Sequence, residues 1–485
     1  MRHIPFELGR NPQTLSEPFA AGFDLSSMCR YSEHMDVRIA ALCVSILILS
    51  TVAQAEFKLQ RLYTGGNAAQ RPTFLLQGND GNFYGTMANA GYLFKMTPSG
   101  AVTITPTLGG LNPELALGDD GNIYGSVNGQ TFGNTNGYIF KWTPAGQFTI
   151  AFAFDGTNGA RPSGMRKGID GCFYGVMGRT NASRILFPPL TNHAAIFQFT
   201  TNNTVTKLYS VTNGLLGSDF TGLPVQGPDG YLYGTMFSDS GHVFPPLFSP
   251  YLLRFYRLST NGDFQIICTR TNASASAGDL IFGPDGLLYG TISTDVRGYP
   301  TVKSGSVFRI TTNGVFSSLF SFGSTNGMDP EARLLGANDG NLYGSTYGGG
   351  SNNRGTLYSI SVQGEFTSLL SFTGANGSNP TGPLVQAADG NLYGVTESST
   401  VTNIGTIYRL VQPTIISDFG ISNGTATLTW NSFPNGIYRV EYKSALSDLS
   451  WVPLIQRVTA TDQTITVFDN AATDPQRLYR VALLP

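Results

Sequence analysis

Short stretches in which apolar and polar residues alternate recur along the chain, separated by turns rich in glycine and asparagine. The unit 329–372 is a clear example, with four such stretches at 332–335, 342–346, 355–361 and 366–372. Alternation with a period of two is typical of half-buried β-strands. The pattern therefore predicts four short antiparallel strands in each unit.

A six-residue motif, Asp-Gly-x-x-Tyr-Gly, marks every unit. It begins at seven aspartates, namely Asp80, Asp120, Asp170, Asp229, Asp285, Asp339 and Asp389. Asp-Gly between apolar runs predicts a tight hairpin turn, because glycine accepts positive φ and aspartate caps the turn backbone. The Tyr-Gly pair begins the next strand, where the glycine leaves room for a close neighbour. Four strands in a repeat of about 40–60 residues predict a propeller blade rather than a solenoid coil.

The two ends of the repeat region predict how it closes. The seventh repeat supplies three strands, the third at 406–410, and then runs into Pro413. Residues 57–63 precede the first complete repeat and have the pattern of a fourth strand. Pairing of these two segments would remove the exposed edges of a linear array. We therefore predict an all-β fold in which a seven-bladed β-propeller, residues 56–412, is closed by its N-terminal strand.

From residue 413 the pattern changes to five short alternating segments. They lie at 425–430, 438–443, 451–454, 464–468 and 478–483. In the second segment, Tyr438, Val440 and Tyr442 alternate with charged residues, so one face is apolar. This pattern predicts a small C-terminal β-sandwich, residues 413–485, of the fibronectin-III or immunoglobulin type.

The N-terminal residues 1–55 have the pattern of a leader with a signal peptide. Arg38 precedes an apolar run at 39–52, which is followed by Ala53-Gln54-Ala55. This order predicts a secretory signal cleaved after Ala55. The run is shorter than the roughly 20 residues of a membrane-spanning helix. We expect a secreted or cell-surface protein that is not integral to the membrane, with Met35 as the true start.

Charge and cysteine content narrow the possible partners and cross-links. Charged residues make up 12% of the chain, the formal net charge is -2, and no basic or acidic run occurs. Nucleic acid is therefore not an expected partner. Beyond Ala55 the cysteines are Cys172 and Cys268, in different repeats, and we predict that they are not paired. Without disulfides, the stability of the predicted fold would come from its hydrophobic core.

The repeat resembles a known family. The seven motif copies, each followed by segments such as Gly305-Ser-Val-Phe-Arg-Ile-Thr-Thr-Asn-Gly314, resemble the Gloeo_Verruco (GloVer) tandem repeat of exported bacterial proteins, over residues 57–410. Copies three and four depart from it, with long inserts and with Cys172 or Tyr231 where asparagine is usual. The resemblance implies an extracytoplasmic location and a C-terminal attachment module. The family has no established activity, so it implies no catalytic residue and no cofactor.

The recurring Asp and Tyr side chains have structural explanations. Calcium takes six to eight oxygen ligands, whereas each repeat offers one carboxylate, or two at Asp119-Asp120. Turn geometry accounts for the aspartates, and we predict no metal site. The motif tyrosines are expected to pack between blades with a satisfied hydroxyl rather than to stack on a ligand.

The sequence contains few combinations of residues that are typical of catalytic sites. The two histidines beyond the leader, His193 and His242, lack metal-binding spacing, and no Gly-x-Ser-x-Gly elbow with triad partners is evident. A carboxylate pair for glycoside chemistry is kept as an alternative. Its members would come from five acidic residues that the repeat spacing allows on one face of the propeller: Asp239, Asp295, Asp329, Glu331 and Glu397. We predict no catalytic residue.

The candidate ligand-binding residues lie in long inserts between second and third strands. The inserts of repeats three and four both contain Phe-Pro-Pro-Leu, and such loops often carry function. The candidates are Phe187, Phe244, Tyr251, Arg184 and His193, with Arg297 and Tyr299 of repeat five. Alternatively, Phe-Pro-Pro-Leu packs each insert onto its own blade, or one insert onto the other. The predicted function is a monomeric, non-catalytic binding module for a glycan or another envelope component. The alternative is a polysaccharide hydrolase or lyase.

Overall fold

The structure is a computed structural model of the 485-residue chain. It divides the chain into two units, Met1–Ala55 and Glu56–Pro485. The described residues belong to the second unit and span 57–484, except 66–70, 88–90, 107–113, 130–135, 179–193, 212–217, 239–251, 271–275, 294–304, 331, 399–404, 412–415, 423, 433–436, 446, 449, 462–463 and 471–476. None of these residues forms a helix long and apolar enough to cross a membrane.

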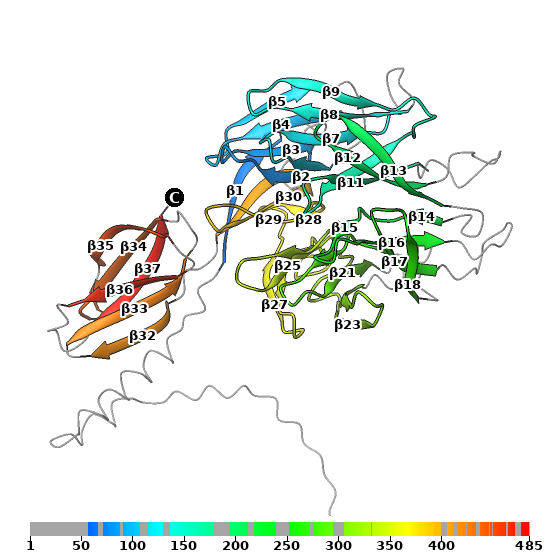
Figure 1. Ribbon diagram of the computed structural model, residues 1–485. Helices are drawn as coiled ribbons and strands as arrows, with labels where there is room; N and C mark the ends of the chain where they lie inside the picture. The colour runs from blue at the N-terminus through cyan, green and yellow to red at the C-terminus, as the bar shows by residue number, and fades with distance from the viewer. Residues whose placement is uncertain are drawn as a thin grey trace, which may run out of the picture. The chain divides into compact units, whose positions relative to one another are not determined.

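Seven antiparallel sheets, here numbered 1 to 7, account for the described strands up to Val411 (Figure 1). Sheet 1 contains β2 (Pro72–Gln77), β3 (Phe83–Met87), β4 (Tyr92–Met96) and β5 (Val102–Pro106). Sheet 2 contains β6 (Leu115–Leu117), β7 (Ile123–Val127), β8 (Tyr138–Trp142) and β9 (Phe148–Ala153). Sheet 3 contains β10 (Pro162–Lys167), β11 (Phe173–Met177), β12 (Ala195–Thr200) and β13 (Thr204–Ser210). Sheet 6 contains β24 (Leu335–Gly336), β25 (Leu342–Thr346), β26 (Thr356–Ile360) and β27 (Phe366–Ser371).

In the other three sheets the first strand is split in two. Sheet 4 contains β14 (Ser218–Phe220) and β15 (Val225–Gln226), then β16 (Leu232–Ser238), β17 (Leu252–Leu258) and β18 (Phe264–Arg270). Sheet 5 contains β19 (Ser276–Ala277) and β20 (Ile281–Phe282), then β21 (Leu288–Ser293), β22 (Gly305–Ile310) and β23 (Phe316–Ser321). Sheet 7 contains β28 (Ser378–Pro380) and β29 (Val385–Gln386), then β30 (Leu392–Ser398), β31 (Thr406–Val411) and β1 (Lys58–Thr64).

The first strand of each sheet is less regular than the sequence predicts. The predicted strand 332–335 of sheet 6 is only Leu335–Gly336. Met328 and Gly348 form an isolated bridge, but Asp329 has φ 54° and the proline that follows it has no N–H group, so the pairing is not continuous with β24. In sheet 7 a proline likewise separates β28 from β29.

The Asp-Gly-x-x-Tyr-Gly motif forms the same hydrogen-bonded turn in all seven sheets. One oxygen of each aspartate accepts a hydrogen bond from the backbone N–H two residues on. The other oxygen accepts one from the motif tyrosine hydroxyl, at 2.5–2.8 Å. The aspartate is therefore a turn cap that also satisfies a buried phenol, as the turn interpretation predicts.

The glycine after each tyrosine lies against an aromatic ring of the third strand. A Cβ on Gly85 would lie 2.2 Å from the carbonyl oxygen of Phe74 and 2.3 Å from the ring of Phe94. The same contact recurs for Gly125 with Phe140, Gly175 with Phe197, Gly234 with Tyr256, Gly290 with Phe308, Gly344 with Tyr358 and Gly394 with Tyr408. Close approach of the ring explains why this position is glycine.

The turn carboxylates make stability depend on pH. Although burial raises the pKa values of Asp80 and Asp120, hydrogen bonds from their Asn, Tyr and Lys neighbours outweigh it and lower both to about 2. An unfolded aspartate titrates near ~3.9. Because the folded-state pKa is the lower one, these groups stabilise the fold above about pH 4, and this contribution is lost as the pH falls towards 2.

We expect the melting temperature to fall between pH 4 and pH 2, and to fall less steeply in Asp120→Asn. Thermal melts across this window measure the slope. The matched control is Asp263→Asn, at an exposed turn where the side chain accepts one hydrogen bond, from Ser259. Equal slopes for the two variants would show that the motif carboxylate does not carry the acid dependence.

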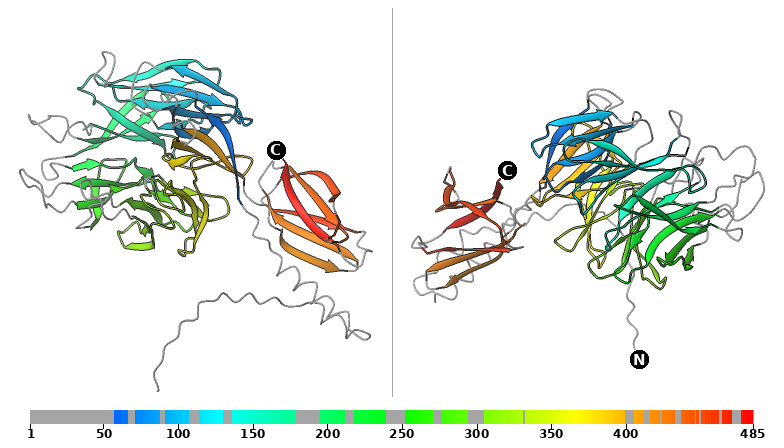
Figure 2. Two further views of the ribbon diagram at one scale, coloured as in Figure 1. Left: turned by 180° about the vertical axis from the view of Figure 1, so that it is seen from behind. Right: turned by 45° about the horizontal axis from the view of Figure 1, so that its top comes forward.

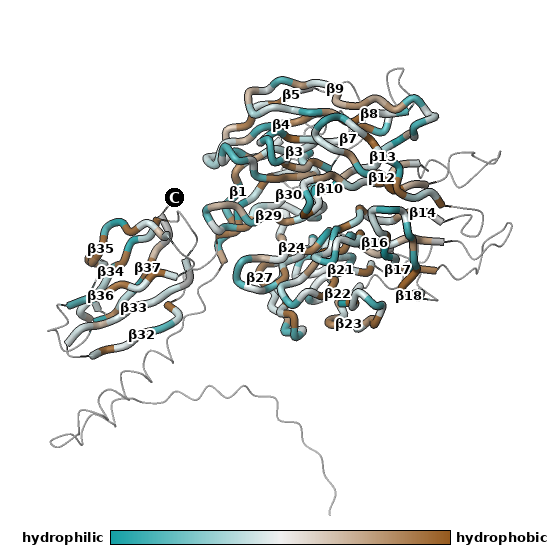
Figure 3. The backbone as a smooth tube through the Cα atoms, in the orientation of Figure 1, coloured by the Kyte–Doolittle hydropathy of each residue, from teal (hydrophilic) through white to brown (hydrophobic). Residues whose placement is uncertain are grey.

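Apolar clusters join each sheet to the next. Tyr84 of sheet 1 packs with Trp142 of sheet 2, and further clusters join sheets 2 and 3, 3 and 4, 4 and 5, 5 and 6, and 6 and 7. Another cluster joins sheet 7 back to sheet 1, where Phe83 and Tyr393 have ring centroids 4.3 Å apart. Figure 3 shows apolar stretches within the strands and hydrophilic residues at many turns. The core therefore lies between the sheets.

Glutamines also tie neighbouring turns together. The Gln77 side-chain oxygen accepts a hydrogen bond from the N–H of Ala388 in sheet 7, at 2.8 Å. Gln386 does the same with the N–H of Asn338 in sheet 6, at 2.9 Å. These bonds link backbones that are adjacent in space but belong to different sheets.

The N-terminal strand β1 is the outer strand of sheet 7. It pairs antiparallel with β31, from Lys58 opposite Val411 to Thr64 opposite Thr406. Leu62 and Tyr63 contact the cluster shared with sheet 1, whereas Phe57 and Leu59 contact the cluster shared with sheet 6. The segment thus contributes apolar contacts on both faces of its sheet.

Residues from Ile416 onwards form two three-stranded sheets (Figure 2). One has the order β32 (Ile416–Ser422), β33 (Thr425–Asn431), β36 (Thr464–Asp469), and the other β35 (Val452–Thr459), β34 (Ile437–Lys443), β37 (Leu478–Leu484). Both contribute to one core, in which Trp430 and Tyr438 make an edge contact. The sequence did not predict β32. Cys172 and Cys268 are both free, as predicted.

Candidate functional site

Four charged side chains from four sheets converge at one place, which we call the hub: Glu114, Arg166, Asp279 and Arg333. First strands of neighbouring sheets contact one another here, as β2 and β10 both do with β6. Glu114 immediately precedes β6. The other end of β6, Leu117, pairs with Ile123 across the Asp-Gly turn, so Glu114 lies at the end of the strand remote from that turn. We call this end the loop face and the other end the turn face. The hub thus lies towards the loop face.

Arg166 connects three sheets. From β10 in sheet 3, its Nη1 donates to the carbonyl oxygens of Leu223 in sheet 4 and Leu280 in sheet 5, at 3.4 and 3.3 Å. Its Nη2 forms an ion pair with Asp279 of sheet 5. The other oxygen of Asp279 accepts a hydrogen bond from the Leu223 N–H, at 2.9 Å. Burial and then the charge of Arg333 lower the pKa of Arg166 to about 9, which still leaves the guanidinium charged at neutral pH.

Glu114 lies between two guanidinium groups without a hydrogen bond to either. Its Oε2 is 3.6 Å from Arg333 Nη1 and 3.9 Å from Arg166 Nε. These distances exceed those of a hydrogen bond. Nearby, the buried Tyr256 hydroxyl has no hydrogen-bond partner within the described residues. The hub therefore holds donors and an acceptor whose capacity no described residue uses.

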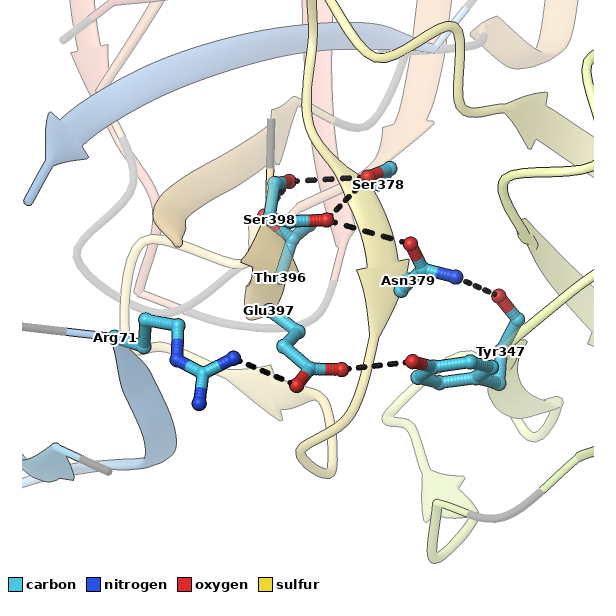
Figure 4. A network of polar contacts seen from close by, with 7 residues as sticks. All are labelled: Arg71, Tyr347, Ser378, Asn379, Thr396, Glu397 and Ser398. Atoms are coloured by element: carbon cyan, nitrogen blue, oxygen red, sulfur yellow. Dashed lines mark hydrogen bonds and ion pairs between the residues drawn. The ribbon is translucent and has the colours of Figure 1, made fainter. Parts of the chain in front are cut away.

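A second polar network, which we call the clasp, joins sheets 1, 6 and 7 (Figure 4). Glu397, in β30, accepts from Arg71 Nη1 at 2.8 Å and from the Tyr347 hydroxyl at 2.8 Å. Asn379 donates from Nδ2 to the Tyr347 carbonyl oxygen at 3.0 Å, and accepts from Ser398 at 3.4 Å. Asn379 has φ 57°, a conformation that asparagine tolerates. Each oxygen of Glu397 thus has its own partner, so the clasp ties the sheets together.

Two of the five acidic residues considered for glycoside chemistry lie in the described part of the chain. Glu397 belongs to the clasp, whereas Asp329 is buried and accepts a hydrogen bond from Ser293 at 3.3 Å. Tyr347 contacts both residues, since its N–H donates to the Asp329 carbonyl oxygen. Asp239, Asp295 and Glu331 lie outside the described residues. No group of three His, Cys, Asp or Glu side chains that could hold a metal ion occurs among the residues described.

The predicted ligand-binding residues are not among those that the structure describes. All seven lie outside the described residues: Phe187, Phe244, Tyr251, Arg184, His193, Arg297 and Tyr299. The hub itself was missed by the sequence reasoning, although one signal was present. Glu114, Asp279 and Arg333 each stand six positions before a motif aspartate. Aligning the repeats on that aspartate would have placed three charged residues at one structural position.

The fold and its sheet arrangement define the protein as a β-propeller. Two solved structures of virginiamycin B lyase from Staphylococcus aureus are similar to it. A catalytically inactive variant with quinupristin is 17% identical with a TM-score of 0.51, covering 73% of this chain and 100% of the lyase. A selenomethionine-substituted form is 16% identical with a TM-score of 0.50, covering 74% and 100%. At this identity the similarity shows the fold alone.

The family model of the Gloeobacter/Verrucomicrobia repeat matches residues 254–433. These residues carry that repeat, and the resemblance noted in the sequence is confirmed. Among curated proteins, none matches this chain.

Proposed function

We propose that this protein is an exported, non-catalytic β-propeller that binds a glycan or another envelope component on its loop face. One observation carries the proposal: of the three described carboxylates in the hub and the clasp, two are held by side chains of the protein itself, and Glu114 alone makes no such hydrogen bond. Asp279 is paired with Arg166, and both oxygens of Glu397 accept hydrogen bonds. A hydrolytic pair needs two carboxyl groups free to reach the substrate. This arrangement suits recognition better than acid–base chemistry.

The proposal includes a seven-bladed ring. Seven clusters that join consecutive sheets, and the pairing of β1 with β31, support a ring closed by the N-terminal strand, over residues 56–412. Residues 413–485 would form an attachment module of the fibronectin-III or immunoglobulin type, supported by the two sheets and their shared core.

Export is supported by the leader. The apolar run 39–52 and Ala53-Gln54-Ala55 have the order of a secretory signal. The second unit of the structure begins at Glu56, the residue that follows the predicted cleavage site. We infer that the protein acts as a monomer outside the cytoplasm. Amino-terminal sequencing of the secreted protein would test this, and a first residue other than Glu56 would contradict the cleavage site.

A glycan array probed with the chain from Glu56, read together with release of reducing ends, tests the function. We expect saturable binding to a defined set of glycans and no release of reducing ends above a heat-denatured control. Catalytic release would instead favour the alternative, a polysaccharide hydrolase or lyase. The absence of binding to any glycan would overturn the glycan-directed part of the proposal.

A further inference from the structure

We propose that the hub is the binding site for one neutral sugar residue of such a glycan. This inference rests on the proposed function and assigns its ligand to four side chains. Glu114 and Arg333 are the accessible members, with side chains 28% and 23% exposed, whereas Arg166 and Asp279 are 13% and 14% exposed. Glu114 and Arg333 are thus the more exposed members of the hub, and Arg166 and Asp279 are the more buried ones.

Charge balance indicates a neutral ligand. The hub contains two guanidinium groups and two carboxylates, so its formal charge is zero. An anionic or cationic ligand would leave an uncompensated charge among partly buried groups, which is costly. A neutral polar molecule can enter without disturbing this balance.

The unused hydrogen-bonding capacity indicates hydroxyl groups. Arg333 and the Arg166 Nε can only donate, whereas the Glu114 carboxylate can only accept. They face one another at 3.6 and 3.9 Å, too far for direct hydrogen bonds. A hydroxyl both donates and accepts, so vicinal hydroxyls of a sugar could bond to the Glu114 carboxylate and the Arg333 guanidinium together, whereas the buried Arg166 Nε lies out of a ligand's reach.

Gly164 of sheet 3 lies beside Glu114, and Leu223 approaches it closely. A Cβ at this position would lie 3.7 Å from the Cβ of Glu114 and 3.1 Å from a methyl group of Leu223. Gly164 stands six residues before its motif aspartate, as Glu114 does in sheet 2. At this level of sheet 3, therefore, no side chain competes with a ligand for Glu114.

The test compares Glu114→Gln with Asp119→Asn in the chain from Glu56. Both replace an acid by its amide near sheet 2, but Asp119 lies on the turn face, is 72% exposed and pairs with Lys167. Titration calorimetry would use the best neutral oligosaccharide from the array. We expect Glu114→Gln to raise the Kd at least about tenfold, because a hydrogen bond to a charged group is lost. Asp119→Asn should bind as the unaltered chain does.

Phenylglyoxal, which modifies accessible arginine side chains, tests the site in the unaltered chain and therefore needs no variant that must fold. We expect the same oligosaccharide to protect Arg333 from labelling but not the exposed Arg457. Binding without protection of Arg333, or with an unchanged Kd in Glu114→Gln, would overturn the hub site and leave the proposed function standing. Preference for an acidic sugar would overturn the neutral ligand. No binding to any glycan would refute the glycan-directed function itself.

Discussion

Deletion of residues 57–64 from the chain that begins at Glu56 is expected to lower its free energy of unfolding by about 3–6 kcal/mol. This estimate assigns roughly half of a full burial contribution to each of four apolar side chains. Phe57 and Leu59 pack on the core between sheets 6 and 7, and Leu62 and Tyr63 on the core between sheets 7 and 1. Removal of β1 would also leave β31 as an exposed edge. Urea denaturation measures the change.

A peptide of residues 57–65 supplied in trans is the matched control. Its addition to the deleted chain should raise the melting temperature in proportion to the logarithm of its concentration above the Kd. The same peptide with Leu59 and Leu62 replaced by aspartate should have no effect. If the deleted chain denatures at the same urea concentration as the chain from Glu56, β1 is dispensable and the closed ring is not supported.

Replacement of Arg166 by methionine is expected to cost about 3–5 kcal/mol of the free energy of unfolding. Methionine keeps much of the apolar stem but removes the guanidinium that pairs with Asp279 and donates to Leu223 and Leu280. The mostly buried carboxylate of Asp279 would lose its cation, and two carbonyl oxygens would lose a donor. An unpaired buried charge is the largest part of the cost.

Two further variants separate this cost from general disturbance. Addition of Asp279→Leu to Arg166→Met should recover part of the stability, since it removes the stranded charge. The neighbouring Lys167→Met breaks an ion pair with Asp119, whose side chain is 72% exposed, and should cost only about 0–1 kcal/mol. If Arg166→Met alone lowers the free energy of unfolding as little as Lys167→Met does, solvent reaches the Asp279 carboxylate and replaces its partner.

Local periodicity in the sequence was sufficient to place most strands. The predicted segment 342–346 is β25, Leu342–Thr346, and the predicted 57–63 is β1, Lys58–Thr64. These predictions succeeded because alternation and Asp-Gly turn chemistry act between residues that are close in sequence. The same reasoning missed β32, Ile416–Ser422, because a bulge between Ile416 and Asp418 breaks the alternation.

The candidate site depended on tertiary structure. Glu114, Asp279 and Arg333 occupy equivalent repeat positions, but no single repeat indicates that charges of opposite sign meet there. Arg166 stands two positions further on and reaches Asp279 past the backbone of sheet 4. Most strands thus follow from the sequence by itself, since alternation and turn chemistry act between neighbours along the chain. The hub and the clasp were decided only when separate sheets brought their side chains within reach, because ion pairs act through space.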